Sequence, residues 1–211
     1  MRIAKEGSTL ILLALGLTVG SAFLGWFMLT TFLFLISLAV IGFFRDPDRK
    51  TPAGEAIVVA PADGKVVAIE QVAKGRLLGR ASQQLSIFLS PLDVHVNRSP
   101  IHGRVEQSEY QAGKFFAAYR GKASTENEQN AIKIVHPGGT EVTMVQIAGF
   151  LARRIVCHVG RGDSLARGQR IGMIMFGSRV DLFLPPDAQL QVQRGERVRG
   201  GETIVATMRG V

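Results

Sequence analysis

The chain reads VGRGDSLARGQRI over residues 159–171 and, at an offset of 33 residues, VQRGERVRGGETI over residues 192–204. Valine, glycine, an acidic residue, an aliphatic residue, glycine and isoleucine recur in step in the two copies. Each copy reads as a strand, a glycine turn and a second strand. The pair therefore predicts two similar hairpin units related by a pseudo-two-fold axis.

This repeat resembles the barrel-sandwich shape of lipoyl and biotinyl carrier domains. A carrier domain needs a modifiable lysine on the turn between its halves, but no lysine follows Lys133. The connection between the two copies contains Gly177-Ser178 instead. We therefore expect a mainly β, barrel-sandwich-like domain that is not a carrier of this kind.

The sequence before the repeat also favours β structure, because short runs rich in valine and isoleucine alternate with glycine and proline. The region from Gly113 to Asn130 breaks this rhythm, and its charges and Gly121 favour a loop or short helix that could cover a site. The expected strands are Ile57 to Ala60, Gly64 to Gln71, Gln84 to Leu89, Gly103 to Tyr110, Ala131 to His136, Glu141 to Ile147 and several more after Ile155.

The N-terminal region carries no charged residue from Ser8 through Phe44. One helix of that length would measure about 55 Å, whereas the hydrocarbon core of a bilayer is about 30 Å thick. Two shorter spans, near 8–24 and 27–44 with a turn at Gly25, therefore fit better than one long tilted span. A cleaved signal peptide is a third possibility, but the apolar stretch is long for one and no clear cleavage site follows it.

Basic residues flank this region on both sides, and cytoplasmic loops are enriched in such residues. The pattern predicts a transmembrane helical hairpin, residues 1–44, with both ends in the cytoplasm. The prolines and charges that follow it end a membrane helix, so a β-rich domain of residues 45–211 would lie on the cytoplasmic face of the cell membrane. The flanking basic residues are Arg2, Lys5, Arg45, Arg49 and Lys50.

The formal net charge is +8. Lysine and arginine are scattered, without a basic run or interleaved aromatic residues, so we expect no nucleic-acid partner. A basic body on a membrane anchor is attracted to anionic lipid headgroups, although a solvated basic surface explains the charge equally well. Cys157 is the only cysteine, which excludes an intrachain disulfide, and no metal site is expected.

The dipeptide Gly177-Ser178 lies in the largely apolar run from Met173 to Asp181. A serine held in a tight turn can attack the carbonyl of the preceding peptide bond, and glycine leaves that carbonyl accessible. Taken alone, however, the pair is equally consistent with an ordinary β-turn.

Three further segments contain polar groups suited to chemistry, and each also has a purely structural explanation. Asp63-Gly64 fits a turn before a strand. His95 lies between Val94 and Val96, and a histidine in such a strand is more often hydrogen-bonded for structural reasons than a base. The stretch from Lys114 to Asn130 is, by itself, only an amphipathic loop.

Together these segments match a known family in order and spacing: the chain closely resembles the short bacterial form of phosphatidylserine decarboxylase. The resemblance covers nearly all of residues 45–211, and several motifs in order are more specific than any one of them. The matching segments are Phe43-Phe44-Arg45-Asp46-Pro47, Pro61-Ala62-Asp63-Gly64, Ser90-Pro91-Leu92-Asp93-Val94-His95-Val96-Asn97-Arg98, Lys114 to Asn130, Ala152-Arg153-Arg154-Ile155-Val156 and Phe176-Gly177-Ser178-Arg179-Val180-Asp181.

The resemblance implies that the chain is the proenzyme of a pyruvoyl-dependent lyase. Ser178 would attack the carbonyl of Gly177, and elimination would then separate a β chain of residues 1–177 from an α chain of residues 178–211. Residue 178 would end as an N-terminal pyruvoyl group, the cofactor for decarboxylation of phosphatidylserine to phosphatidylethanolamine. The substrate would be a phospholipid in the membrane, and the two cleaved chains would stay together as partners.

The resemblance also assigns roles to other residues. Asp63 and His95 match the aspartate and histidine of the self-cleavage relay, and His95 is also the expected proton donor in decarboxylation. Arg98, Arg153 and Arg154 are expected to bind the lipid phosphate or the serine carboxylate. Arg98 stands where longer members of the family carry a second histidine. The family's behaviour further implies a homo-oligomer, a dimer or larger.

Two other functions are consistent with the residues themselves. A membrane-anchored barrel-sandwich adaptor without catalysis would use Gly177-Ser178 only as a turn and would remain one intact chain. A serine hydrolase would use Ser178, His95 and Asp63 to cleave other proteins, since such a triad arises on many folds.

Overall fold

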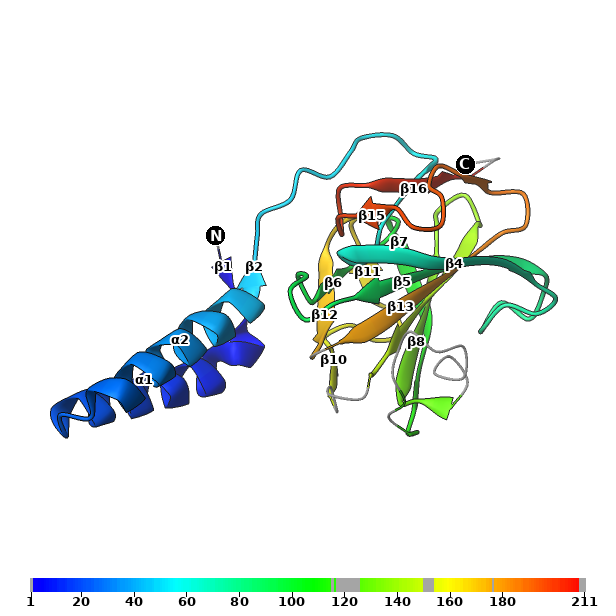
Figure 1. Cartoon of the computed structure of the whole chain (residues 1–211). Coiled ribbons are helices and arrows are strands. Elements are labelled where there is room, and N and C mark those ends of the chain that lie inside the picture. The colour runs from blue at the N-terminus through cyan, green and yellow to red at the C-terminus, as the bar shows by residue number, and fades with distance from the viewer. Residues whose placement is uncertain (1, 115, 117–125, 150–153, 176, 209–211) are drawn as a thin grey trace. The chain divides into compact units, whose positions relative to one another are not determined.

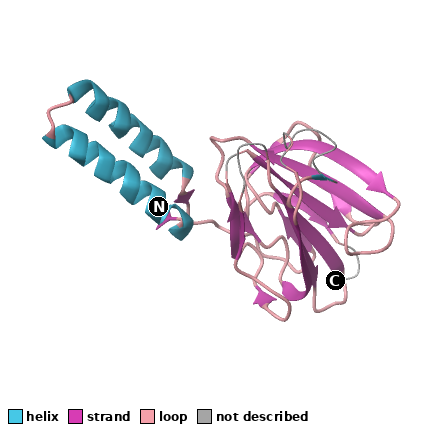
Figure 2. Cartoon of the chain, turned by 90° about the horizontal axis from the view of Figure 1, so that it is seen from below, coloured by secondary structure: helices cyan, strands magenta, loops and turns pink. Residues whose placement is uncertain are grey.

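The computed structural model describes residues 2–114, 116, 126–149, 154–175 and 177–208 of the chain. The chain divides into two compact units, Met1–Asp48 and Arg49–Val211. The first unit is mainly helical and the second is built of strands (Figure 1, Figure 2).

The helical unit is a pair of apolar helices in the region where the sequence predicts membrane spans. The chain turns between them at Gly25, whose φ of +73° favours glycine. The segment Lys5–Phe23 is long and apolar enough to cross a membrane, and Phe27–Phe43 is a shorter apolar helix. The bounds are η1 Lys5–Gly7, α1 Ser8–Phe23 and α2 Phe27–Phe43.

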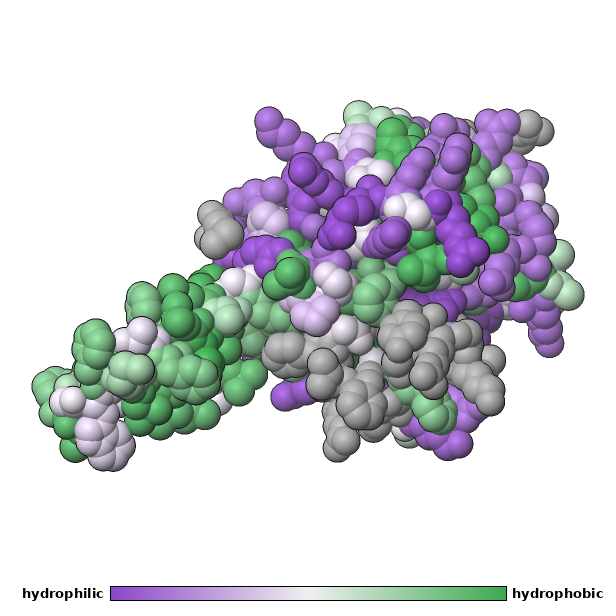
Figure 3. Space-filling view, viewed as in Figure 1, coloured by the Kyte–Doolittle hydropathy of each residue, from purple (hydrophilic) through white to green (hydrophobic). Residues whose placement is uncertain are grey.

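Polar side chains of the two helices face one another, whereas large apolar side chains point outward. Thr18 Oγ1 lies 3.1 Å from Ser37 Oγ, and Ser21 Oγ lies 2.9 Å from Thr30 Oγ1. Phe23, by contrast, is 89% exposed, and the outer surface of the pair is mostly apolar (Figure 3). This arrangement is the reverse of a soluble helix pair and suits contact with lipid.

Two short strands close the base of the helix pair. β1 (Arg2–Ile3) pairs with β2 (Arg45–Asp46) in antiparallel register. Arg2 Nε also lies 3.4 Å from Asp48 Oδ1. The charged segments before α1 and after α2 therefore lie together at one end of the pair.

The strands of the second unit form one large sheet and two small ones. They are β3 (Ile57–Val59), β4 (Gly64–Val72), β5 (Ser82–Leu89), β6 (Val96–Arg98), β7 (Gly103–Gln111), β8 (Gln129–Val135), β9 (Glu141–Ile147), β10 (Ile155–Cys157), β11 (Ser164–Leu165), β12 (Arg170–Ile174), β13 (Ser178–Leu184), β14 (Gln189–Leu190), β15 (Arg197–Val198) and β16 (Ile204–Thr207). The eight-stranded antiparallel sheet has the order β11-β7-β8-β9-β13-β5-β4-β15, and the three-stranded sheets have the orders β10-β12-β6 and β14-β16-β3 (Figure 1).

Every strand expected before residue 150 is present, with ends within two residues of the prediction. The largest differences are at β5 and β8, which each begin two residues earlier than expected, and the prediction omitted the short strand β6. Within the region predicted as a loop or short helix, Lys114 forms a bridge with Asn127.

The repeated segments make equivalent contacts with the large sheet. Gly162 N donates to Val105 O at 2.8 Å, and in the second copy Gly195 N donates to Val66 O at 2.8 Å. The first copy adds β11 beside β7 and the second adds β15 beside β4, so the order of the sheet is symmetric about the central pair β9 and β13. The predicted pseudo-two-fold is visible in these contacts.

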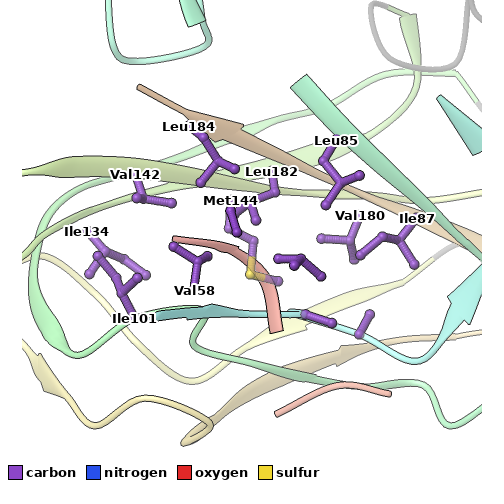
Figure 4. Packing of buried hydrophobic residues seen from close by; sticks show 14 of the residues in the cluster. Val58, Leu85, Ile87, Ile101, Ile134, Val142, Met144, Val180, Leu182 and Leu184 are labelled. Atoms are coloured by element: carbon purple, nitrogen blue, oxygen red, sulfur yellow. The ribbon is translucent and has the colours of Figure 1, made fainter. Parts of the chain in front are cut away.

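The core lies on one face of the large sheet, which we call the inner face. In β13 the alternate residues Val180, Leu182 and Leu184 point into it, together with Val142 and Met144 of β9. Figure 4 shows these side chains meeting residues from β5, β8 and β3. Such alternation places one side of each strand in the core and fixes the register.

Candidate functional site

Two chain connections lie side by side at one end of the β unit. Residues 90–95 lead from β5 to β6, and residues 175–177 lead from β12 to β13. Because β13 pairs with β5 and β12 pairs with β6, the two connections are neighbours. Ile174 N donates to His95 O at 3.3 Å, and Ser178 is directly opposite Leu89. We call this end of the β unit the crossover end.

Ser178 is the first residue of β13 and is fully buried. Ser178 is two residues before Val180 in β13, so the two side chains point to the same side of the sheet, which is the inner face. Ser178 Oγ has no hydrogen-bond partner among the described residues. Gly177 before it has a φ of +65°, a left-handed conformation that favours glycine. The predicted cleavage site is thus a buried hydroxyl directly after an unusual backbone conformation.

His95 is also fully buried, and its ring orientation is fixed. His95 Nδ1 lies 2.9 Å from the carbonyl oxygen of Asp93, which can only accept, so Nδ1 carries a proton. In the neutral ring the lone pair is then on Nε2, as a general base requires. The turn that presents the ring is closed by a hydrogen bond of 2.8 Å from Ser90 N to Asp93 Oδ2, and Arg197 also binds Asp93.

A side-chain hydrogen bond between the two sheets relates the segments that carry His95 and Ser178, which both lie toward the crossover end. Gln146 Nε2 donates to Asn97 Oδ1 at 2.9 Å, which joins the large sheet to β6. Gln146 is directly opposite Val180. Ser178 lies two residues from Val180 toward the crossover end, and His95 lies two residues from Asn97 in the same direction, about 7 Å in each case.

Asp63, the expected relay carboxylate, is held by an ion pair and a turn. Arg49 Nη2 lies 2.9 and 2.8 Å from its two oxygens, and Gly200 N donates to Oδ1 at 2.8 Å. Asp63 comes directly before β4, whose second residue is Lys65. Lys65 is opposite Phe88 of β5, and Phe88 is opposite Arg179 of β13. The start of β4 is therefore two strands from the start of β13, about 10 Å away.

The three expected arginines have different surroundings. Arg98 directly follows Asn97 in β6, and Asn97 points inward to Gln146, so the Arg98 side chain lies on the other face, where its Nη1 donates to Gly168 O at 3.2 Å. Arg154 is exposed, and its carbonyl oxygen accepts a hydrogen bond of 3.3 Å from Met175 N, beside the cleavage site. Arg153 lies outside the described residues.

The sequence prediction missed three buried amides next to this site. Asn130 Nδ2 donates to Gln146 Oε1 at 3.1 Å, and Gln146 continues to Asn97. All three are at inner-face positions, where the rest of β8 and β9 carry apolar side chains. The sequence does contain a signal for Asn130. It stands two residues before Ile132 and four before Ile134, so a polar residue occupies a position of the strand where an apolar residue is expected.

On the outer face of β13 a buried ion pair joins this strand to β5. Arg179 Nε lies 2.5 Å from Asp181 Oδ1, and both residues are almost fully buried. Arg179 Nη2 donates to Ser86 Oγ at 2.6 Å, and Gln84 Nε2 donates to Asp181 Oδ2 at 2.9 Å. These contacts hold the strand that begins at Ser178.

A cavity of about 710 Å³ lies away from the crossover end and is lined by His102 and His136, among others. Ligand atoms of Glu55, His102 and His136 lie within 4.8 Å of one another. However, Gly138 N donates to His136 Nδ1 at 3.0 Å, so Nε2 carries the proton of the neutral ring and is not ready to bind a metal. Burial and the neighbouring His102 lower the pKa of His136.

Comparison with known proteins places the chain in a well-defined group. The sequence profile described as phosphatidylserine decarboxylase matches residues 36–206. The phosphatidylserine decarboxylase proenzyme of Magnetococcus marinus is 44% identical over 209 residues, covering 99% of this chain and 96% of the relative. The proenzyme of Aromatoleum aromaticum is 45% identical over 98% of this chain and 95% of the relative, and that of Cupriavidus pinatubonensis is 48% identical over 83% and 81%.

Proposed function

The chain belongs to the phosphatidylserine decarboxylase family, and from this premise we propose that it cuts its own backbone between Gly177 and Ser178 to make its pyruvoyl cofactor. The resemblance seen in the sequence motifs is confirmed, and the chain is a phosphatidylserine decarboxylase, a carboxy-lyase that acts in phospholipid biosynthesis. Proenzymes of this family form the pyruvoyl group from a serine. The assignment of that serine to residue 178 is our proposal.

The surroundings of Ser178 fit the formation of such a group. Its Oγ is buried and has no hydrogen-bond partner among the described residues, so no hydrogen bond to this part of the chain has to be broken before it attacks. No described neighbour lies within 4 Å of the point where a Cβ on Gly177 would project, so the approach to the Gly177 carbonyl is open on that side. The buried, unpartnered hydroxyl of Ser178 is the observation that carries the proposal.

The cleavage uses groups of the chain and one water molecule. Ser178 Oγ bonds to the carbonyl carbon of Gly177 while its proton passes to His95 Nε2. The C–N bond then breaks as the protonated His95 returns that proton to the departing nitrogen, which leaves an ester and a free amine. Removal of the Cα proton of residue 178 then breaks the Cβ–Oγ bond and releases a chain ending in the Gly177 carboxylate. Water replaces the amine of residue 178, which leaves as ammonia, and a ketone remains.

In the mature enzyme the neighbours of residue 178 provide binding and a proton. When formed, the pyruvoyl group supplies a carbonyl that accepts the electron pair released as carbon dioxide leaves. We assign to His95 the protonation of the substrate carbon that has lost carbon dioxide. The fully buried Leu89 and Ile174 surround the site with apolar surface, where a carboxylate is poorly solvated and its loss as neutral carbon dioxide is favoured.

We assign the remaining predicted residues supporting roles. Asp63 positions the relay through the backbone. Its ion pair with Arg49 fixes the segment before β4. In that segment the carbonyl oxygen of Pro61 accepts a hydrogen bond of 2.8 Å from Arg98 N, in the strand that follows His95. Arg154, exposed beside the cleavage connection, would bind the lipid phosphate. For Arg98 and Arg153 a part in substrate binding stays a prediction from the family resemblance.

We also propose the membrane topology and the assembly. Residues 1–44 would form a hairpin of two membrane spans, because β1 and β2 join its charged ends, and both ends would be cytoplasmic. Residues 45–211 would form the catalytic domain on that side, cleaved into a β chain of 1–177 and an α chain of 178–211. A homo-oligomer stays a prediction, to be checked by light scattering with detergent correction.

Intact-mass spectrometry of the purified protein tests the cleavage directly. We expect a chain of residues 1–177 and a fragment of residues 178–211 that resists Edman degradation because its N-terminus is a ketone. Borohydride should reduce that ketone, shift the fragment mass by two hydrogens and abolish decarboxylation. Recovery of lipid-active protein as one uncut chain of 22.8 kDa would refute the proposal.

A further inference from the structure

A second corner of the β unit is built like the corner that holds Asp63. Residues 61–66 read PADGKV and residues 100–105 read PIHGRV. The glycines of these segments open β4 and β7. A Cβ on Gly64 would lie 2.2 Å from a backbone oxygen of β5, and one on Gly103 would lie 2.4 Å from a backbone oxygen of β8. His102 therefore stands where the first corner has Asp63.

The two corners differ in how their polar groups are satisfied. Asp63 accepts hydrogen bonds from Arg49 and from Gly200 N. At the second corner His136 is 5% exposed, and its Nε2 has no hydrogen-bond partner among the described residues. Gly138 N donates to its Nδ1 and burial lowers its pKa, so the ring is neutral and Nε2 carries the proton. A buried N–H donor without an acceptor costs free energy.

A carboxylate of the chain marks the place where an acceptor would fit. Glu55 Oε2 lies 3.4 Å from His102 Nε2 and 3.8 Å from His136 Nε2, and the second distance is too long for a hydrogen bond. The two imidazole rings are in edge-to-face contact, with centroids 4.2 Å apart. The Glu55 side chain is 75% exposed, so it can leave this position at little cost.

The cavity lined by the two rings has basic groups on its wall. Its volume of about 710 Å³ is that of a site for a small organic molecule. Arg104 and Arg161 line it as well, and Arg104 Nε donates to Gly162 O at 3.1 Å, which holds this side chain beside the cavity. The acidic lining residue, Glu106, lies 2.8 Å from Lys133 Nζ and is neutralised by it. The wall therefore favours an anion.

This cavity is separate from the proposed cleavage site. β8 begins at Gln129, which is opposite Ile147 of β9, and Ile147 is opposite the second residue of β13. The strand ends at Val135, directly before His136. The six residue steps from 129 to 135 span about 20 Å. A ligand in the cavity would therefore not contact the reacting atoms.

We infer that the cavity is a second binding site, which takes the phosphate group of a small anion or of a lipid headgroup. His136 Nε2 donates to a phosphate oxygen at the position that Glu55 Oε2 holds in the empty site, and Arg104 and Arg161 neutralise the charge. The donors come from four separate segments, an arrangement that suits the tetrahedral oxygens of phosphate better than a planar carboxylate. The inference does not rest on self-cleavage.

Equilibrium dialysis of the full chain with radiolabelled glycerol phosphate measures this binding. The protein is held in a maltoside detergent, which contains no phosphate. We expect Arg161→Gln to weaken binding about tenfold and His136→Phe to weaken it about 10- to 100-fold, the usual effect of losing a hydrogen bond to a charged group. Arg194→Gln, an exposed position that matches residue 161 in the second repeat copy, is the control and should bind like the wild type.

The variant Glu55→Gln distinguishes an anion site from a metal site. Removing this carboxylate takes away a negative charge that competes with the ligand, so we expect glycerol phosphate to bind about fivefold more tightly. A metal site would respond in the opposite way, because it would lose a ligand and its affinity for zinc ions would fall. Glu109→Gln, an exposed acid at the far end of β7, is the matched control and should leave the affinity unchanged.

Imidazole nitrogen signals of histidine-labelled protein locate the ligand and identify its source. The chain has four histidines, so the Nε2–H signal of His136 is assigned by its loss in His136→Phe. A shift of this signal by glycerol phosphate in detergent, with none in nanodiscs of phosphatidylglycerol, identifies a soluble phosphate as the ligand. A shift in the nanodiscs without any soluble phosphate identifies the lipid headgroup.

The remaining outcomes would overturn the inference. It is wrong if glycerol phosphate does not bind and the His136 signal shifts in neither medium, or if Arg161→Gln and Arg194→Gln weaken binding equally. It is also wrong if Glu55→Gln binds the probe less tightly. Because residues 55 and 161 are exposed, their variants decide the matter even if His136→Phe does not fold. Intact mass of the same samples tests self-cleavage separately, and an uncut wild-type chain would refute the proposed function without touching the binding result.

Discussion

His95 and Ile174 are joined through their backbones, since Ile174 N donates to His95 O at 3.3 Å. This bond ties the connection that carries the imidazole to the connection that carries Gly177 and Ser178. A shift of one connection therefore moves the other, and the pairing of β6 with β12 fixes the position of His95, the proposed base, relative to the connection that carries the Ser178 hydroxyl.

Ser178→Ala should leave the chain uncut and without decarboxylase activity, because both the attacking hydroxyl and the source of the ketone are lost. Intact mass and release of carbon dioxide from phosphatidylserine vesicles measure the two effects. Ser164→Ala, at an exposed position in β11, is the control and should be cleaved and active. A Ser178→Ala protein that still decarboxylates would overturn the assignment.

Gly177→Ala should slow self-cleavage about tenfold. The φ of +65° at this position costs a residue with a Cβ roughly 1–2 kcal/mol, so the reactive backbone conformation becomes less populated. The space around the site is open, so a steric clash is not the cause. Gly160→Ala, where a Cβ would also meet open space but no positive φ is required, should cleave normally. Equal rates for the two variants would contradict this explanation.

His95→Gln should lower decarboxylation by about 100- to 10,000-fold per cleaved molecule, the usual contribution of a positioned acid or base. The fraction of cleaved chain is measured by mass in the same sample, so that loss of processing is not counted as loss of turnover. His158→Gln, at an exposed position, serves as the control. A cleaved His95→Gln enzyme with wild-type turnover would remove this histidine from the reaction.

Asp181→Ala should destabilise the β unit by about 3–5 kcal/mol, because it leaves the Arg179 guanidinium buried without its counter-charge. The measurement is denaturant unfolding in the Ser178→Ala background, where the chain stays in one piece. Asp187→Ala, at an exposed position, should change stability by less than about 0.5 kcal/mol. A similar small effect at Asp181 would show that this ion pair contributes little.

His136 should make the folded chain lose stability as the pH falls. Burial lowers the pKa of His136 below its ordinary value, so the unfolded chain takes up a proton on this residue near pH 6.5 while the folded chain does not. The contribution is complete at neutral pH and above, and it declines as the pH drops through about 6.5. Unfolding of Ser178→Ala between pH 7.5 and 5 should show this decline, and His136→Gln should reduce its slope.

Much of the fold follows from local sequence patterns. The alternation of apolar residues located the long strands to within two residues, because a buried face imposes a spacing of two. The copy of residues 159–171 at 192–204 predicted two equivalent units, and the glycines at matching positions, Gly162 and Gly195, do make equivalent bonds. The uncharged stretch before residue 45 predicted the helix pair, since no polar side chain there demands water.

The site was only partly predictable. Gly177-Ser178 and His95 stand out by residue type, but nothing local shows that the segments after β5 and before β13 are neighbours, since that depends on the pairing of distant strands. For the same reason the amide chain through Gln146 was missed: its members come from three strands. Arg98 is close to His95 in sequence, but its side chain bonds to Gly168 O on the other face of β6, so its part in substrate binding stays a prediction.

The position of β13 determines whether the protein can refold after cleavage. β13 is hydrogen-bonded to β5 on one side and to β9 on the other, and β16 pairs with β3 near the start of the unit. The proposed cut before Ser178 would therefore yield a naturally split protein whose small piece supplies β13, a central strand of the large sheet, and could not depart without opening that sheet. Once denatured, the mature form would have to reassemble from two separate polypeptides. Each molecule can therefore fold as one chain only before it is cut.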